Sequence, residues 1–383
     1  MKVSIIMPTY NDESTIENTL DSVMEQTYKD IELIIVDDGS TDGTKKVIEN
    51  YKNKKDIKDI IKYIYQENQD QLNAILNGLN YVTGEYIHIL HSDDLINEKN
   101  SIQKCVEYME NNKQIESIIG DLIIIDKDGN VTGKQTVKNF KNKECLIPLQ
   151  LLWLGRNLYI DVGFHRKDTY INKIKENYLK WNTPFWINFN EDITLLNVQK
   201  VNFSFYKYRV FEENYINEYS GQLNVINGEL RTAIKIMKKY SIPFYRFQYF
   251  LFRVFNKLKL EYIPIYIKKE EKDKKKIIKF IIKKRFKEKY KENRFLDALV
   301  KYYSIKSDRI IEINENIEKV YMGKDIRVFN KKLLNNELES FYINMLEDMS
   351  NGFKKIIVKN KEQKEKVQDI CSFLCIDPII VIK

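Results

Sequence analysis

The stretch Ile31-Glu32-Leu33-Ile34-Ile35-Val36-Asp37-Asp38-Gly39-Ser40 joins a short apolar run to an acidic turn. An apolar run of this length, bounded by turn residues, is typical of a buried strand. Two further runs have the same form: Lys2 to Met7 leads into Pro8-Thr9-Tyr10-Asn11, and Glu85 to Leu90 leads into His91-Ser92-Asp93-Asp94. We therefore expect a buried sheet with polar and acidic residues where its strands end.

Helical patterns lie between these strands. Ser14-Thr15-Ile16-Glu17 has the spacing of a capping box and predicts a helix with Ile16, Leu20 and Val23 on one face. The other elements expected here are a helix from about Thr44, a strand over 60–65 and a helix over 70–82. Alternating strands and helices favour an α/β fold with parallel pairing and right-handed crossovers. Ligands of such sheets bind beyond the carboxyl ends of the strands.

The rest of the chain changes character twice. A strand over 118–125 and a hairpin turn at Asp128-Gly129 precede a less regular aromatic segment. An aromatic helix is expected over 244–258, and the later strands expected are 326–329, 355–358 and 378–382. We predict a main domain over 1–218, a helical region over 219–300 and a small α/β module over 301–383.

Composition excludes several classes of protein. The chain has 383 residues, of which 43% are hydrophobic and 31% charged, as in a globular rather than a disordered protein. No apolar run approaches the length that spans a bilayer, and the first residues lack the features of a secretion signal. The four cysteines form no paired framework. We expect a cytoplasmic protein with buried free thiols.

The net charge of +8 is concentrated in one segment. Residues 268–291 contain thirteen Lys or Arg and four Asp or Glu, a net +9, so the remainder carries −1. This uneven distribution argues against a protein that binds nucleic acid. The apolar residues of the segment that share a helical face are Ile278, Ile281, Ile282, Phe286 and Tyr290. They predict a helix that packs on a core or, alternatively, lies on an anionic membrane.

The acidic strand ends favour a ligand site. Asp38 follows one predicted strand, and Asp93 and Asp94 follow another. A divalent cation held by carboxylates can bridge the phosphates of a nucleoside diphosphate, and Asp38 could accept a hydrogen bond from a base. Aspartate, glycine and serine are also common in solvated turns, but two acidic ends in one α/β unit favour binding.

The ordered set of motifs resembles family 2 glycosyltransferases with the GT-A fold. The resemblance rests on residues 3–11, residues 35–42, Gly84-Glu85-Tyr86-Ile87 and Ser92-Asp93-Asp94. It covers roughly residues 1–100, with a weaker match to about 215. A single such motif occurs by chance, whereas the ordered set is specific. It implies a Rossmann-like, mostly parallel sheet and transfer of a sugar from a nucleotide sugar in one inverting step.

The resemblance also implies roles for individual residues. The positions that match nucleotide-binding residues of the family are Pro8, Thr9, Tyr10 and Asp38. Asp38 would face the uracil N–H of a UDP-linked donor. Asp93 would lie on the ribose or metal side, and Asp94 would bind Mn²⁺ or Mg²⁺, which neutralises the leaving diphosphate. Asn73 is a further nucleotide-binding candidate in a segment that departs from the family pattern.

The family resemblance places a catalytic base after the aromatic segment that contains Trp186. Asp192 matches that position and Glu191 is the alternative, although both could be acids at a helix N-terminus. The base would deprotonate the acceptor hydroxyl as it attacks the anomeric carbon. His165 and Trp186 are candidates for the acceptor side, and each could instead pack in the core.

Two further histidines, His88 and His91, lie three apart on one predicted strand, so their side chains point to opposite faces and cannot form a metal pair. We expect His88 in the core and His91 near the donor.

The predicted function is transfer of one sugar from a nucleotide sugar, UDP-linked by preference, to a hydroxyl group. The acceptor would be a cell-surface glycan, a lipid-linked saccharide or a protein, and a lipid-linked acceptor would suit contact of 268–291 with the inner face of the cell membrane. The alternative is a non-catalytic nucleotide-sugar- or carbohydrate-binding protein with a decayed site. A nucleotidyltransferase is disfavoured because Pro8-Thr9-Tyr10-Asn11-Asp12 is not a glycine-rich basic loop.

Overall fold

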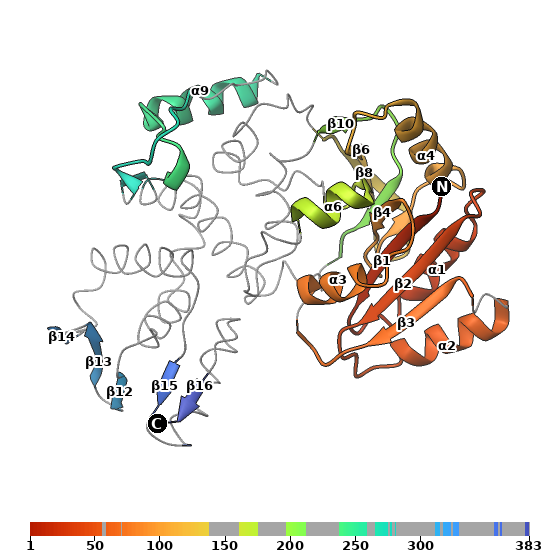
Figure 1. Cartoon of the computed structure of the whole chain (residues 1–383), viewed down its shortest axis with the longest axis horizontal. Helices are drawn as coiled ribbons and strands as arrows, with labels where there is room; N and C mark the ends of the chain where they lie inside the picture. The colour runs from red at the N-terminus through yellow and green to blue at the C-terminus, as the bar shows by residue number, and fades with distance from the viewer. Residues whose placement is uncertain are drawn as a thin grey trace. The chain divides into compact units, whose positions relative to one another are not determined.

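The computed structural model describes the chain in several ranges, which are 1–137 except 56–58 and 70, 161–174, 197–211, 237–258, 265–274, 276–277, 280, 311–314, 317–322, 325–328, 356–358, 361 and 380–382. The chain divides into two compact units (Figure 1). Unit 1 comprises Met1–Ile147, Arg156–Tyr178 and Pro184–Asn214, and unit 2 comprises the remaining residues.

The described part of unit 1 is built on a seven-stranded sheet in the order β10-β6-β9-β4-β1-β2-β3. Its strands are β1 (Val3–Thr9), β2 (Ile31–Asp37), β3 (Ile61–Tyr65), β4 (Tyr86–Ile89), β6 (Ser117–Ile119), β9 (Phe164–Arg166) and β10 (Val198–Lys200). Strands β1, β2, β3 and β4 pair with one another in parallel, whereas β9 runs antiparallel to β4 and β6. The predicted parallel α/β sheet is confirmed.

Helices cover both faces of this sheet because successive side chains of a buried strand alternate between them. The described helices of unit 1 are α1 (Ile16–Met24), α2 (Thr44–Lys55), α3 (Gln71–Leu79), α4 (Ser101–Asn111) and α6 (Lys167–Ile174). Leu33 and Ile35 of β2 share a core cluster with Leu20 of α1. Ile34 and Val36 share another with Ala74 of α3. Both faces of β2 are therefore apolar, as the nearly continuous apolar run from Ile31 to Val36 predicts.

The capping box predicted at the start of α1 does not form. Thr15, not Ser14, is the N-cap residue, and it makes no side-chain capping bond. Its hydroxyl instead donates to the carbonyl oxygen of Asp12 at 3.4 Å. With Thr15 at the cap, Glu17 occupies the second helical position rather than the third, so it is out of register for the reciprocal bond.

The single strand predicted over 118–125 is wrong, because the structure divides it between two sheets. Its second half is β7 (Leu122–Ile125), which joins β5 (Leu95–Ile96), β8 (Val131–Gln135) and β11 (Tyr206–Arg209) in the order β5-β11-β7-β8. Gly120 lies at the break, where an added Cβ atom would come within 2.3 Å of the carbonyl oxygen of Phe203. The predicted hairpin turn between β7 and β8 is confirmed, with Gly129 at φ +89°.

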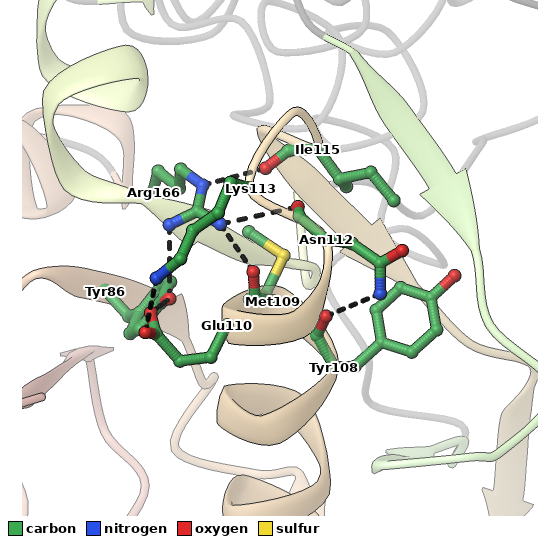
Figure 2. A network of polar contacts seen from close by, with 8 residues as sticks. All are labelled: Tyr86, Tyr108, Met109, Glu110, Asn112, Lys113, Ile115 and Arg166. Atoms are coloured by element: carbon green, nitrogen blue, oxygen red, sulfur yellow. Dashed lines mark hydrogen bonds and ion pairs between the residues drawn. The ribbon is translucent and has the colours of Figure 1, made fainter.

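Arg166 ties the antiparallel strand β9 to the end of α4, as Figure 2 shows. Its guanidinium donates to the carbonyl oxygens of Met109 at 2.6 Å and Ile115 at 2.9 Å, and to the hydroxyl of Tyr86 at 3.1 Å. A cation at this position also interacts favourably with the negative end of the helix dipole. The Tyr86 hydroxyl in turn donates to Glu110, so the contacts form one network.

The described part of unit 2 contains one aromatic helix and short strands. The helix is α9 (Tyr245–Lys257), and the strands are β12 (Ile311–Asn314), β13 (Ile317–Met322), β14 (Asp325–Val328), β15 (Ile356–Val358) and β16 (Ile380–Ile382). The aromatic helix and the last three strands were expected, whereas β12 and β13 were not. Among the residues that the structure describes, no helix is both long and apolar enough to cross a membrane.

Candidate active site

The carboxyl ends of β1, β2 and β4 meet at one edge of the sheet because these parallel strands are neighbours. The Ser92 hydroxyl oxygen, after β4, lies 3.1 Å from the carbonyl oxygen of Pro8 in β1. The backbone N–H of Asp38, after β2, donates to the carbonyl oxygen of Thr9 at 2.9 Å. Both pairs are buried. The polar residues expected at the strand ends therefore lie together.

Asp38 is held in place by the segment between β3 and α3. One carboxylate oxygen of Asp38 accepts hydrogen bonds from the Gln66 amide at 2.7 Å and from the backbone N–H of Gln69 at 2.9 Å. The turn that follows depends on Gly39, which has φ +82° and would bring an added Cβ atom within 2.9 Å of Asn68 N. These contacts set the direction of a buried carboxylate that is only 3% exposed.

Asp12 links the end of β1 to the acidic segment, and the sequence did not single it out. One of its oxygens accepts hydrogen bonds from the Thr9 hydroxyl at 2.9 Å, from the backbone N–H of Tyr10 at 3.0 Å and from the Ser92 hydroxyl. Burial raises its pKa above the usual value, against these hydrogen bonds. The Tyr10 side chain beside it is half exposed.

Asp94 is buried, and its carboxylate is oriented by residues of β11, a strand of the second sheet. The Tyr206 hydroxyl donates to one Asp94 oxygen at 2.6 Å, and the backbone N–H of Arg209 donates to the other at 2.7 Å. The Arg209 guanidinium, also buried, donates to the carbonyl oxygen of Asp93 at 2.6 Å. Tyr206 and Arg209 were not predicted, because no local pattern links them to residues more than 100 positions away.

The two adjacent carboxylates carry strongly perturbed pKa values. Burial is the main cause that raises the pKa of Asp93 to about 7, and repulsion from the nearby Asp12 carboxylate is the second. Burial also raises the pKa of Asp94 well above its usual range, with repulsion from Asp93 as the second cause. A bound cation favours the ionised form of both carboxylates, because its positive charge offsets the cost of burying them and the repulsion between them.

His91 completes a group of three side chains that fits a divalent cation. Ligand atoms of His91, Asp93 and Asp94 all lie within 4.8 Å of one another. Burial lowers the pKa of His91 to about 4, so its ring is neutral, and Nε2 is buried with no hydrogen-bond partner in the described part of the chain. A neutral imidazole beside two carboxylates suits Mn²⁺, and the carboxylates alone suit Mg²⁺. The sequence placed His91 near the donor but did not include it among the metal ligands.

Gln71 controls which nitrogen of His91 is available. Its amide group lies 3.0 Å from His91 Nδ1. Rotation of the amide by half a turn would place its oxygen on Nδ1–H and leave the Nε2 lone pair for a cation.

Asn73 of α3 is exposed and lines a pocket together with Gln66, Gln69, Leu76, Asn77 and Asn80, and Gln66 also contacts Asp38. His165 is fully buried, with Nδ1 2.7 Å from the Ser117 hydroxyl, which favours the packed alternative over an acceptor contact. His88 is buried as expected. Asp192, Glu191 and Trp186 lie outside the described residues.

Comparison with known proteins shows what the chain resembles. Residues 4–166 match the model of glycosyl transferase family 2. The glycosyltransferase GlyA of Streptococcus pneumoniae serotype 4 is 37% identical over 110 residues, which are 28% of this chain and 15% of that protein. A Campylobacter jejuni protein, GalNAc(5)-diNAcBac-PP-undecaprenol beta-1,3-glucosyltransferase, is 26% identical over 261 residues, 64% of this chain and 81% of its own. The chain spans less than half the length of the first curated relatives that it matches.

A solved structure shares the fold. Residues 1–349 of TarS from Staphylococcus aureus, in complex with UDP-GlcNAc, superpose with a TM-score of 0.51 over 86% of this chain and 99% of that chain. The two sequences are 16% identical. The likeness is therefore one of fold, and the expected fold is confirmed.

Proposed function

We propose that the chain transfers one sugar from a nucleotide-diphosphate sugar to an acceptor hydroxyl, as expected of glycosyl transferase family 2, whose model residues 4–166 match. The observation that carries the proposal is the group of His91, Asp93 and Asp94 at the end of β4. Asp38 lies at the end of β2, and β1 separates the two strands. Neighbouring strands are about 4.8 Å apart, so the two sites are separated by about 10 Å, which a nucleoside diphosphate can span.

Different residues at the sheet edge bind the base and the diphosphate of the donor. Asp38 accepts hydrogen bonds from the base, and the nearby residues that shape the nucleotide site are Pro8, Thr9, Tyr10 and Asn73. Asp93, Asp94 and His91 hold Mn²⁺ or Mg²⁺, and the bound cation supplies neutralisation of the diphosphate charge. Asp94 is kept in position for this by Tyr206 and Arg209.

On the acceptor side, we propose Asp192 as the base that takes the proton of the attacking hydroxyl, with Glu191 as the alternative. This assignment rests on the sequence pattern after the aromatic segment. Attack from the face opposite the departing diphosphate inverts the configuration at the anomeric carbon. The base must be within hydrogen-bond reach of the acceptor hydroxyl.

The donor is proposed to be UDP-linked, and the acceptor to be a cell-surface glycan, a lipid-linked saccharide or a protein. The TarS structure that shares the fold is a complex with UDP-GlcNAc, which makes this sugar nucleotide the first donor to test. The name of the Campylobacter jejuni relative describes a lipid-linked acceptor and a glucosyl donor. If the acceptor is lipid-linked, contact of residues 268–291 with the membrane would bring the enzyme to its acceptor.

The proposal is tested by measuring hydrolysis of UDP-GlcNAc, UDP-glucose, UDP-galactose and GDP-mannose by the full chain, with Mn²⁺, with Mg²⁺ and with chelator. We expect slow release of nucleoside diphosphate from one UDP-sugar, only when a cation is present. Binding of a sugar nucleotide without turnover, even with added acceptor saccharides, would favour the non-catalytic alternative. Absence of both binding and turnover for every donor would contradict both functions.

Asp94→Ala should abolish cation-dependent hydrolysis, because the diphosphate charge would then have no ion to neutralise it. Asp128→Ala is the matched control, since Asp128 is an exposed turn residue. Full activity of the Asp94→Ala variant in chelator would contradict the metal role.

A further inference from the structure

The helix α9, which is blue-green in Figure 1, has one face that is apolar and exposed. Its large apolar side chains are Phe247, Phe250, Val254 and Leu258, which are 60%, 59%, 36% and 61% exposed. Intervals of three and four residues place all of them on one side of the helix. The usual fate of such a stripe is burial against a core. Here it is the other side of α9 that is buried.

The buried side of α9 is also aromatic. Tyr249 and Phe252 are 9% and 5% exposed, and the Tyr249 ring lies 5.3 Å from the ring of Phe280. The helix therefore satisfies its packing within unit 2 and still presents a second apolar face. Isolated exposed apolar residues are normal on protein surfaces, but a continuous stripe marks an interaction site.

Cations border the exposed stripe. Arg246, Arg253 and Lys257 follow one flank at intervals of seven and four, and all three are exposed. The helix contains no aspartate or glutamate. Among the described residues, no ion pair engages these three side chains. The flank therefore carries positive charge beside the apolar face.

The opposite flank extends the apolar surface. Gln248 joins this flank to Ile265 through two hydrogen bonds, from its amide nitrogen to the Ile265 carbonyl oxygen at 2.8 Å and from the Ile265 N–H to its amide oxygen at 2.7 Å. Ile265 and Ile267 are 64% and 47% exposed, and Lys269 beyond them is exposed as well.

We propose that this face of unit 2, the α9 surface (Phe247, Phe250, Val254, Leu258, Arg246, Arg253 and Lys257), lies in the interface of a membrane that contains anionic lipids. An interfacial helix buries its apolar side chains at the boundary of headgroups and acyl chains, while flanking cations contact anionic headgroups. A second copy of the chain would meet the same cations without a carboxylate on α9 to pair with them. Charge therefore favours an anionic lipid surface as the occupant. The proposal is independent of sugar transfer.

The test is co-sedimentation of the full chain with vesicles of phosphatidylcholine, with and without phosphatidylglycerol. We expect binding to the anionic vesicles only, and weaker binding as salt rises. Phe247→Ser with Phe250→Ser should reduce the apparent affinity tenfold or more, because two aromatic side chains leave the interface. Arg246→Gln with Arg253→Gln should reduce it about 25-fold, at roughly fivefold for each cation.

Val131→Ser is the matched control, since Val131 is 64% exposed on β8 of unit 1 and should leave binding unchanged. Thermal unfolding of each variant checks that it is folded. No binding of the wild type to anionic vesicles overturns the proposal. The proposal is also overturned if binding survives both double substitutions but is lost with Lys269→Gln and Lys272→Gln. That result would assign the membrane contact to the basic segment 268–291. A dimer in solution that the phenylalanine substitutions dissociate would instead assign the face to a second copy.

Discussion

Tyr206 affects the acidic site through a single hydroxyl group. Its ring packs 5.8 Å from the ring of His88 in the core, and its hydroxyl donates to Asp94. Tyr206→Phe keeps the ring and removes the donor. We expect the Mn²⁺ concentration for half-maximal donor hydrolysis to rise about 10–100-fold, the usual cost of losing a partner of a metal ligand.

The measurement is a metal titration of hydrolysis at saturating donor. The control is Tyr208→Phe, since Tyr208 is on the same strand and its ring packs against the core of unit 1. An unchanged Mn²⁺ dependence in Tyr206→Phe would mean that the Asp94 carboxylate does not bind the cation.

Asp192 and its neighbour Glu191 can be distinguished by amide substitutions that preserve shape. Asp192→Asn should lower turnover by about two to four decades, because the side chain can no longer accept the proton. Donor binding should persist, since the base acts on the acceptor. Glu191→Gln is the matched control and should be active. The reverse result would move the base by one residue.

At the scale of elements, the break between β6 and β7 depends on Gly120. Gly120→Ala would place a Cβ atom 2.3 Å from the Phe203 carbonyl oxygen, so the backbone leading to β11 must move. We expect a loss of about 2 kcal/mol or more in the free energy of unfolding, the range of overpacking substitutions.

Gly133→Ala in β8 is the matched control, because an added Cβ atom there meets nothing within 4 Å. Urea denaturation of both variants provides the comparison. Equal stability of the two would show that the approach of Phe203 to the break is not tight.

The antiparallel strand β9 inserts a buried histidine into the middle of the sheet. Burial lowers the pKa of His165 to about 3, whereas the unfolded chain has the ordinary value of 6.5. The unfolded state therefore binds more protons between these values. The contribution of His165 to stability is fully present above pH 6.5 and is lost as the pH falls toward 3, at up to about 1.4 kcal/mol per pH unit.

Urea unfolding at pH 7.5, 6.0 and 5.0 tests this contribution. His165→Gln cannot take up the proton, so its stability should fall less over this range than that of the wild type. Parallel losses in the two proteins would exclude His165 as the source of the pH dependence.

At the scale of the whole molecule, the proposed chemistry and the proposed membrane contact belong to different units. Phe247→Ser with Phe250→Ser should leave hydrolysis of a soluble UDP-sugar unchanged, because no α9 residue belongs to the donor site. Transfer to a lipid-linked acceptor presented in anionic vesicles should fall with vesicle binding. An equal loss of soluble hydrolysis would mean that the substitutions act on folding, which thermal unfolding would reveal.

Local pattern was enough to predict the α/β class, the parallel strands and their acidic ends. The run from Ile31 to Val36 specifies a strand buried on both faces, and Asp37-Asp38-Gly39 ends it with residues that suit a turn. These features depend on periodicity and turn chemistry within about ten residues. They also place Asp38 and Asp94 at the same edge, because parallel neighbours end together.

Contacts between distant segments could not be obtained in this way. Tyr206 and Arg209 reach Asp94 from 112 and 115 positions away, through a second sheet that the pattern did not predict. Asp12 meets Ser92 across 80 positions, and His91 joins the carboxylates through the turn after β4. Such pairings follow from the register of neighbouring strands and, for Tyr206 and Arg209, from the close approach of two backbones at Gly120. Periodicity within one segment carries no information about either.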